Sequence, residues 1–575
     1  MSAHKFEITG DSPVIPDILF WRLIGHEALS SPAVYELIVL SKKKKLDAKD
    51  VLGKGFDVII TFDDEGKSPY KRHCQGYATR LTRLAQVGRH YEYRITLRSW
   101  FWLLTRRTNS RIFQDLNLPD ILDKVFDDAP ISPYKKINKR LTASYEPKRY
   151  CVQYQESDFQ FLSRLMEQEG VYYWFDSHDE PGTMYFSDNS DVAHSVLPAK
   201  ATLNYILGDI DDARFNEVVR WTSSRRLDTG KYDSRDSDFK AIRKKLGTSM
   251  NVADDHDLAD FEEFEFAGGY FKSSDADRLA RIHGDELIAR RDRHWAVTSW
   301  PDVAVGKRFT LSGDTDGTAN GDYLIGACTF VVTHSGYEGI HIEEPSEPIA
   351  DVVDGMLAGD AVNGNSREMV LDIIHSTPAL LRGARGVSAF LLTALPVELP
   401  FRPARVTPRV TMPGPQSGIV VGPKGQEIHA DDFGRVKVQF HWDRLGQSDE
   451  KSTCFIRVSQ PWAGKGWGGY FTPRIGQEVI VDFLNGDPDR PIIVGRVYND
   501  DQPIPYQSPT QSGFKTRSTP GGNPNNYNEI RFEDKKGSEE LNIHAERNMS
   551  TSVEVDDSTT VGHDQTLTVD NDRTA

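Results

Sequence analysis

The amino-acid sequence predicts a mainly β protein with a few helices, and three observations carry this prediction. Residues 91–97 alternate Tyr, Ile and Leu with polar side chains, which is typical of a half-buried antiparallel strand. Helix signals are limited to short segments that begin near residues 119, 157 and 274. From residue 418 onward, short strand-like runs are separated by turns rich in Gly, Pro and Asp.

Length and composition set the broad class. The chain has 575 residues, a length typical of three or four domains, and 38% hydrophobic content, which suits a soluble globular protein. Its formal net charge of -16 argues against nucleic acid as a partner, because nucleic acid requires clustered cations. The four cysteines form no Cys-x-x-Cys pair, so neither a disulfide framework nor a zinc site is indicated.

The N-terminus and the hydropathy pattern bear on location. "MSAHKFEITG" has no apolar segment of the kind found in signal peptides, and no run reaches the ~18 apolar residues of a membrane span. We therefore expect a protein made in the cytoplasm that leaves, if at all, through a dedicated machine.

The first 350 residues have a β-rich pattern with two short helices besides the one in 149–176. "FDVIITFDD" (56–64) reads as another strand. One helix is predicted from Pro119, with an apolar face of Ile121, Leu122, Val125 and Phe126. The other follows Ser274, where Asp277 would complete a capping box before Leu279, Ile282, Leu287 and Ile288. The polar segment 222–260 is expected to be rich in loops.

The segment "RYCVQYQESDFQFLSRLMEQEGVYYWFD" (149–176) predicts strand, helix and strand. Ser157 and Gln160 have the form of a capping box, and Gly170 supplies a left-handed stop. The apolar helix face comprises Phe159, Leu162, Leu165 and Met166. Of the nearby acids Glu156, Asp158, Glu167 and Glu169, we expect two to favour the helix N-terminus and two to lie on a solvated face.

Residues 350–390 differ in composition from the rest. They are rich in Gly and small residues, then apolar enough for a short helix, which favours a linker or an insertion. Pro396, Pro400 and Pro403 follow and predict an extended connector. His283 and His294 flank the third helix without partners at metal-ligand spacing, so no metal site is predicted.

Strict alternation returns within residues 418–446, and residues 454–500 add further strand-like runs between loops that contain Gly and Pro. Val436, Val438, Phe440 and Trp442 are expected to share one face. Further strands are predicted around Ile456–Val458, Glu478–Phe483 and Ile492–Tyr498. Five short strands in about ninety residues favour a small barrel of the OB type.

These motifs resemble a known family. The run "GRVKVQFHWDR…RVSQPWAGKGWGGYFTPRIGQEVIVDFLNGDPDRPIIVGRVYN", together with "PFRP" and "QYQESDFQFLSRLMEQEGVYYWF", is similar to the VgrG family, the tip spike of type VI secretion systems. The resemblance covers nearly the whole chain. It implies a phage tail-hub-like head of two related barrel subdomains (1–370), a connector (371–405), an OB-fold barrel (406–503) and the start of an intertwined β-helical needle (514–575).

The C-terminal segment 528–575 consists of very short strand-like pieces. Its apolar residues come singly or in alternate pairs between turns rich in Asp, Ser and Thr, so it cannot close a core alone. Neighbouring coils or other chains must cover these residues, and a disordered acidic tail is the alternative. The candidates for a trimer core are Ile530, Phe532, Leu541, Ile543, Val553, Val555, Val561, Leu567 and Val569.

The resemblance implies a mechanical role. Three chains would form a stiff needle that punctures target envelopes, driven by a contracting sheath. The implied partners are two further copies of the chain, the hexameric Hcp tube, a PAAR-type tip protein, effectors and baseplate proteins. The protein would be cytoplasmic before firing and then delivered into the target cell.

The sequence lacks the familiar enzymatic motifs. The patterns H-E-x-x-H, G-x-S-x-G and G-x-x-x-x-G-K-[ST] are absent. Asp482, Asp487 and Asp489 near Arg490 are better explained as a turn, and the pair His441 and Asp443 lacks a nucleophile. No catalytic residue, cofactor or metal is therefore predicted.

Three hypotheses remain. The first is a structural, piercing spike, which predicts a stable trimer. The second is a spike linked to an enzyme, carried beyond residue 575 or as a bound partner. The third is an aromatic-rich adhesin or carbohydrate-binding module, which would bind a glycan as a monomer and does not explain a barrel followed by needle-like repeats.

Overall fold

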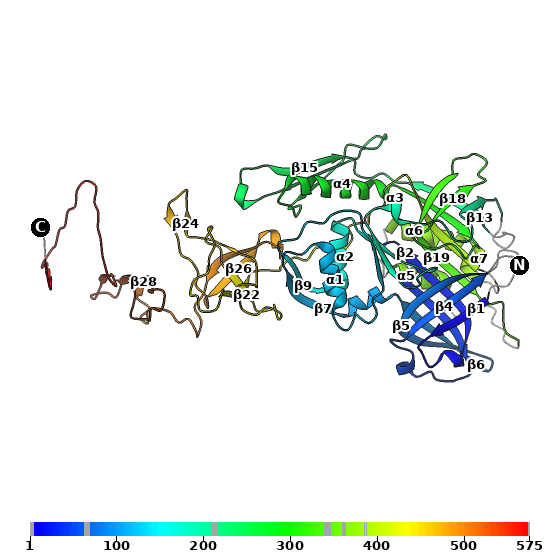
Figure 1. Cartoon of the computed structure of the whole chain (residues 1–575), viewed down its shortest axis with the longest axis horizontal. Helices are drawn as coiled ribbons and strands as arrows, with labels where there is room; N and C mark the ends of the chain where they lie inside the picture. Colours follow the sequence, from blue (N-terminus) through cyan, green and yellow to red (C-terminus); the bar gives the residue numbers. More distant parts are fainter. Residues whose placement is uncertain are drawn as a thin grey trace. The chain divides into compact units, whose positions relative to one another are not determined.

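The computed structural model describes residues 5–62, 69–208, 216–338, 347–358, 364–383, 386 and 388–572. The chain divides into two compact units, shown with the strand and helix labels used below in Figure 1. The first unit contains residues 1–414, 442–445 and 483–490. The second contains residues 415–441, 446–482 and 491–575. The prediction of a mainly β protein is confirmed.

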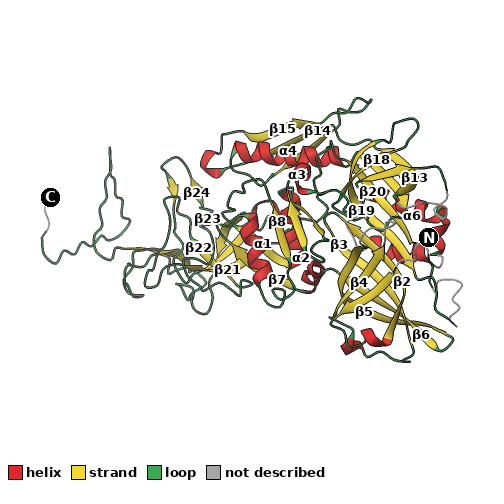
Figure 2. Cartoon of the chain, turned by 45° about the vertical axis from the view of Figure 1, so that its right-hand side comes forward, coloured by secondary structure: helices red, strands yellow, loops and turns green. Residues whose placement is uncertain are grey.

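A single large sheet organises the first unit. One half has the strand order β1 (Lys5–Gly10), β4 (Gly55–Phe62), β5 (Tyr70–Val87), β6 (His90–Arg98), β3 (Ser31–Ser41) and β2 (Ile18–Ala28). The other half continues with β19 (Gly321–Thr333), β18 (Arg308–Ser312), β12 (Thr202–Tyr205), β13 (Glu217–Arg225), β17 (Asp292–Thr298) and β20 (Ser388–Pro396). A further pairing of β19 with β20 closes this second half into a barrel, visible among the yellow strands of Figure 2.

The sequence alternation explains how these strands form a core. In β6 the side chains of Tyr93, Ile95 and Leu97 are buried, as the alternation predicts. In β4 the alternate residues Phe56, Val58, Ile60 and Phe62 point into the same core. Apolar side chains from both halves of the sheet belong to this one core.

A second core lies under three helices, α5 (Ile349–Ala358), α6 (Gly364–Ser376) and α7 (Pro378–Arg382). Val353, Ile373 and Leu380 of these helices are buried together with Trp21 of β2. The sequence pattern favoured a linker or insertion over 350–390 and a connector over 371–405. The structure instead places 388–396 in the large sheet as β20, because its apolar residues pair with both β17 and β19.

A smaller layer in the first unit contains the segment 149–176. Its elements are β7 (Thr108–Phe113), α1 (Leu118–Asp127), β8 (Ile137–Arg140), β9 (Cys151–Ser157), α2 (Asp158–Gln168), β10 (Tyr172–Phe175), β11 (Met184–Ser187) and α3 (Ser190–Ala193). The capping box between Ser157 and Gln160 is present, and Gly170 has a φ of 69°. Of the predicted helix face, Leu162, Leu165 and Met166 are buried, and the core also includes Phe161, which the pattern did not select.

Three of the four acidic side chains around α2, Glu156, Asp158 and Glu169, are buried and Glu167 is half-buried, which corrects the expectation of a solvated face. Asp158 is fully buried and pairs with Arg107 and Arg111. Glu169 is also buried, with Lys148 2.9 Å and Arg278 2.7 Å from its carboxylate oxygens. Spacing along one helix could not reveal these cations, because they come from other elements.

The segment 222–260 holds more strand than expected. β14 (Lys231–Asp236), β15 (Leu246–Asn251) and β16 (Glu262–Phe266) form a three-stranded sheet beside α4 (Ser273–Ala289). The predicted capping box before α4 is wrong. Lys272 precedes the helix without a side-chain cap, and Asp277 instead accepts a hydrogen bond from the Thr248 hydroxyl at 2.8 Å.

The second unit contains the predicted OB-type barrel. Its strands are β21 (Gln416–Val421), β22 (Lys437–Phe440), β23 (Arg457–Val458), β26 (Glu478–Phe483) and β27 (Pro491–Arg496), in the order β22-β21-β26-β27-β23. A bridge between Val436 and Ile456 joins the two edges and closes the barrel. Val436, Val438 and Phe440 are buried as predicted, whereas Trp442 lies beyond the strand and packs on Tyr154 of the first unit, to which both residues belong.

The rest of the second unit is a hairpin, a small sheet and a tail. The hairpin consists of β24 (Trp462–Ala463) and β25 (Gly468–Gly469). The small sheet is the antiparallel meander of β28 (Gln511–Lys515), β29 (Glu529–Glu533) and β30 (Glu540–His544). Residues 545–572 form no strand in the single chain.

Candidate self-association surface

The meander β28–β30 has one apolar face. In its antiparallel register Phe514 lies opposite Ile530, and Ile530 lies opposite Ile543. Phe532 lies opposite Leu541. Residues directly opposite one another in an antiparallel sheet point to the same side, and so do residues two apart on one strand. All five apolar side chains therefore share one face, which we call the apolar face.

The other side of the meander is polar. Arg531 and Glu540, one position away from apolar residues, form an ion pair at 2.8 Å. Lys515 of β28 lies 3.9 Å from the centre of the Tyr527 ring. This division of the two sides is typical of a sheet that packs on one side and meets water on the other.

Within the described residues, the four side chains of β29 and β30 on the apolar face stay largely exposed, and Phe514 is stacked on one side by Phe471. The nine side chains that the sequence selected, from Ile530 to Val569, have exposed fractions between 41% and 86%. Four of them lie in β29 and β30 and five lie in the tail. Exposed apolar groups gathered on one face mark an interaction surface. Phe514 was missed because it stands alone within "DDQPIPYQSPTQSGFKTRSTPGG", which has no alternating partner.

The meander is attached to the barrel within the second unit. Phe471 stacks on Phe514 with ring centres 5.9 Å apart and planes 8° from parallel. Glu427 accepts hydrogen bonds from the Thr519 hydroxyl and from the Gly521 backbone at 2.8 Å. Both bonds lower the pKa of the Glu427 carboxyl, and the bond from Thr519 has the larger effect. The apolar face is therefore held in a defined orientation at the end of a folded barrel.

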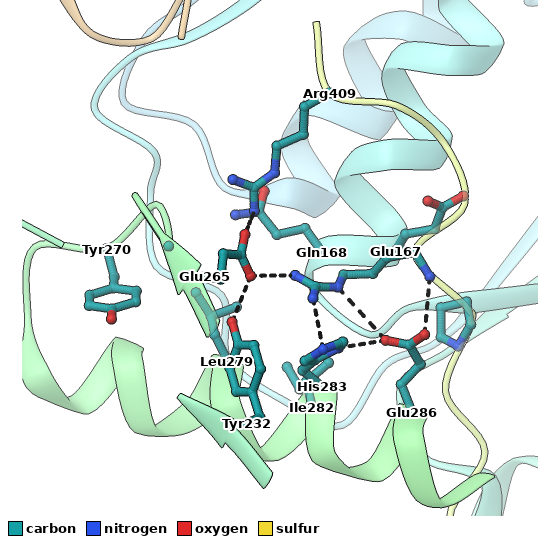
Figure 3. A pocket seen from close by; sticks show the side chains of 13 residues that line it. Glu167, Gln168, Tyr232, Glu265, Tyr270, Leu279, Ile282, His283, Glu286 and Arg409 are labelled. Atoms are coloured by element: carbon teal, nitrogen blue, oxygen red, sulfur yellow. Dashed lines mark hydrogen bonds and ion pairs between the residues drawn. The ribbon is translucent and has the colours of Figure 1, made fainter. Parts of the chain in front are cut away.

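A charged cluster occupies the first unit, around the segment 402–409, which we call the strap. His283 of α4 lies 2.6 Å from Glu286 (Figure 3). Its Nε2 lies 3.3 Å from Glu263 and 2.9 Å from the Arg405 guanidinium of the strap. The prediction that His283 flanks the helix is wrong, since it lies inside α4. Burial lowers the pKa of His283, but its bonds to the two carboxylates outweigh this, and the net shift is upward.

The strap is held by ion pairs along its length. Arg405 and Arg409 each lie 2.9 Å from Glu265 of β16. The Thr407 backbone N–H donates a hydrogen bond to Glu167 of α2 at 2.9 Å. Arg402 lies 3.3 Å from Asp285 of α4. Each of the carboxylates of Glu263, Glu265, Glu286 and Asp285 lies beside a cation or a hydrogen-bond donor. These paired groups fasten the strap to α2, α4 and β16.

The acidic turn 487–490 serves a similar purpose. Asp489 accepts a hydrogen bond from the Val152 backbone at 2.6 Å. The Arg490 guanidinium donates to both carboxylate oxygens of Asp236. Burial, and then repulsion by Asp487, raises the pKa of Asp489 to about 7. Asp443 accepts from the backbone of Leu445 at 3.1 Å, as a turn residue does.

Two further findings concern the described residues only. Within them, no three His, Cys, Asp or Glu side chains gather closely enough to hold a metal ion. None of their helices has the length and apolar character needed to cross a lipid bilayer.

Three families match successive parts of the chain. The phage tail baseplate hub (GPD) matches residues 26–336, and the type VI secretion system/phage-baseplate injector OB domain matches residues 416–498. The bacteriophage T4 gp5 C-terminal trimerisation domain matches residues 512–575, the part that carries the apolar face.

Individual proteins give the same picture. The type VI secretion system spike protein VgrG1b of Pseudomonas aeruginosa is 39% identical, over 95% of this chain and 68% of the relative. VgrG1a of the same organism is 38% identical, over 95% of this chain and 78% of the relative. The solved structure of the E. coli c3393 protein, a type VI secretion component, has a TM-score of 0.54 at 17% identity, over 86% of this chain and 100% of that one; this likeness concerns the fold.

A hub-like head, an injector barrel and a matched trimerisation segment in one chain define a contractile-tail spike. The chain is more than 30% identical to three type VI spike proteins and covers more than two thirds of each. This similarity narrows the class to one family. The chain belongs to the VgrG family of type VI secretion system spike proteins.

Proposed function

We propose that three copies of the chain associate through the apolar face and the tail, and that the resulting spike punctures target envelopes. The observation that carries this proposal is the open apolar face of β28–β30 in the segment that matches a trimerisation domain. A meander of three short strands has too little apolar surface to form a core alone, so the face is stable only when other copies cover it.

The tail 545–572 extends the same interface. In the single chain it has no strand partner, yet Val553 and Val555, like Leu567 and Val569, keep the alternate spacing of a strand. Three tails winding together would pair their backbone groups and bury these side chains. Dense backbone pairing makes such a needle stiff, because bending it distorts many hydrogen bonds together. The surrounding Asp, Ser and Thr residues keep its outside soluble.

The remaining parts have roles that family membership suggests. The proposed division is a hub-like head (1–370, completed by β20 at 388–396), a barrel (406–503) and the start of the needle (514–575). The head would sit on the hexameric Hcp tube and contact baseplate proteins, and the needle would carry a PAAR-type tip and effectors. A contracting sheath would supply the force, so this chain needs no catalytic activity of its own. The spike would be cytoplasmic before firing and then delivered into the target cell.

Native mass spectrometry of the full chain tests the proposal. We expect an assembly with three times the chain mass of 64.8 kDa at micromolar concentration. The test variant is the same chain with Ile530→Asn and Ile543→Asn, which removes two apolar groups from the face and should lower the trimer fraction. A monodisperse monomer of the unmodified chain would contradict the proposal.

A further inference from the structure

The hairpin β24–β25 of the barrel carries two exposed tryptophans. Trp462 and Trp467 are 65% and 59% exposed and pack edge to face, with ring centres 5.0 Å apart. Gly469 lies directly opposite Trp462, and the Gly464 backbone donates to the Trp467 carbonyl at 2.8 Å, so the hairpin is closed by its own backbone. The paired rings are thus presented on an ordered turn.

The base of this hairpin is fixed to the barrel. The Gln460 side chain accepts from the Phe471 backbone N–H at 3.0 Å and donates to its carbonyl at 3.4 Å. Arg496 of β27 also donates to the Phe471 carbonyl. Phe471 therefore has a defined position, and its ring reaches to 3.8 Å from the place where a Cβ on Gly469 would lie.

The hairpin is continuous with the apolar face. Phe471 follows the hairpin by two residues, is held to its base by Gln460, and stacks on Phe514. Phe514 lies opposite Ile530, which lies opposite Ile543. A chain of exposed apolar contacts thus leads from the two tryptophans across Phe471 to the middle of the meander.

We propose that Trp462 and Trp467 contact a second copy of this chain, so that the trimer interface extends from the needle onto the barrel. This inference rests on the proposed trimer and extends it to a surface outside the segment 512–575 that matches the trimerisation domain. In a threefold assembly one surface of each copy meets a different surface of the next copy. The hairpin and the apolar face would therefore be covered together by one neighbour.

The character of the patch favours a protein neighbour. Large aromatic side chains, tryptophan above all, supply much of the binding energy at protein interfaces when they become fully buried. The hairpin between the two rings contributes Ala463, Gly464, Lys465 and Gly466, of which only Lys465 is charged. Its continuity with the apolar face selects a second copy over any other protein.

Photochemical cross-linking of the full chain tests the inference. We expect Trp467→p-benzoylphenylalanine to give an interchain product at twice the chain mass after irradiation. The control is Asn542→p-benzoylphenylalanine on the polar side of the meander, which should give none. If native mass shows the trimer but position 467 gives no interchain product, the inference fails and the proposed trimer stands. If the chain is monomeric, both fail.

A pair of variants measures the energetic contribution. Trp462→Ser with Trp467→Ser should raise the concentration at which the trimer dissociates by roughly tenfold or more. Phe264→Ser with Phe266→Ser, which removes two exposed rings from β16 of the first unit, is the matched control and should leave that concentration unchanged. Equal effects of both pairs would overturn the inference. The inference would also be overturned if the unmodified chain bound an insoluble glycan, the tryptophan variant lost this binding, and position 467 gave no interchain cross-link.

Discussion

Ile530 lies directly opposite Ile543 across β29 and β30, and both side chains are exposed in the single chain. Such a pair normally stabilises a sheet from its buried side. Here it stands on the side that the chain leaves open. The most ordered part of the C-terminal segment is therefore also the part that most needs a partner.

The first prediction concerns this pair. Ile530→Asn and Ile543→Asn place amides in a surface that the trimer would bury, at a cost of about 1–3 kcal/mol for each unpaired group. Three copies multiply this cost, so sedimentation at micromolar concentration should show loss of the trimer. Asn542→Ser, on the polar side of β30, is the control and should sediment as the unmodified chain does. Equal behaviour of the two would show that the face is not an interface.

How far the sequence predicted the structure depends on how far apart the interacting residues lie. Local signals succeeded: the Ser157 capping box, the Gly170 stop and the alternation of β22 are all present. Local patterns could not show that Asp158 meets Arg107 and Arg111, or that 388–396 pairs with two distant strands. Those outcomes depend on which elements become neighbours after folding.

The same reason explains the candidate surface. Alternation selected the apolar residues of β29 and β30, because each strand shows its own period. It could not select Phe514, whose membership of the face depends on its register with Ile530, or the tryptophans, whose contact with the face runs through Phe471. A face made from several short strands becomes visible only when their register is known.

The second prediction concerns the buried Asp158. Its carboxylate is inaccessible to water and pairs with both Arg107 and Arg111, so Asp158→Ala removes their buried partner and leaves them only the more exposed Asp128. Removal of one member of a buried ion pair costs about 3–5 kcal/mol. Denaturant unfolding should show that the free energy of unfolding of the first unit falls by that amount. Asp123→Ala, which breaks a partly exposed pair with Lys139, should cost at most about 1 kcal/mol.

The third prediction concerns the pH dependence set by Asp489. Its pKa in the folded chain is raised to about 7, chiefly by burial. A raised carboxyl pKa gives stability that is present at acidic pH and is lost as the pH rises from the unfolded value through about 7. Asp489→Asn keeps an acceptor for the Val152 N–H without the buried charge, so it should raise the melting temperature at pH 8 and change it little at pH 4.

The control for this effect is Asp487→Asn, at a more exposed neighbour in the same turn. It removes the repulsion that acts on Asp489 but leaves the burial, so it should raise the melting temperature at pH 8 by less than Asp489→Asn does. If the difference in melting temperature between the Asp489→Asn variant and the unmodified chain stayed constant from pH 4 to pH 8, the raised pKa of Asp489 would be contradicted.

The last prediction separates backbone strain from steric conflict at the end of α2. Gly170 has a φ of 69°, and a Cβ added there would lie 2.7 Å from Ile282 of α4 and 3.2 Å from Arg402 of the strap. Gly53 has a similar φ of 77°, but a Cβ there would meet nothing within 4 Å. Gly53→Ala should therefore cost only the strain of the left-handed conformation, about 1 kcal/mol. Gly170→Ala should cost more, because α4 or the strap must also shift. Equal losses in denaturant unfolding would mean that α4 and the strap yield freely, and that the ion pairs of Arg402 and Arg405 do not fix the strap in place.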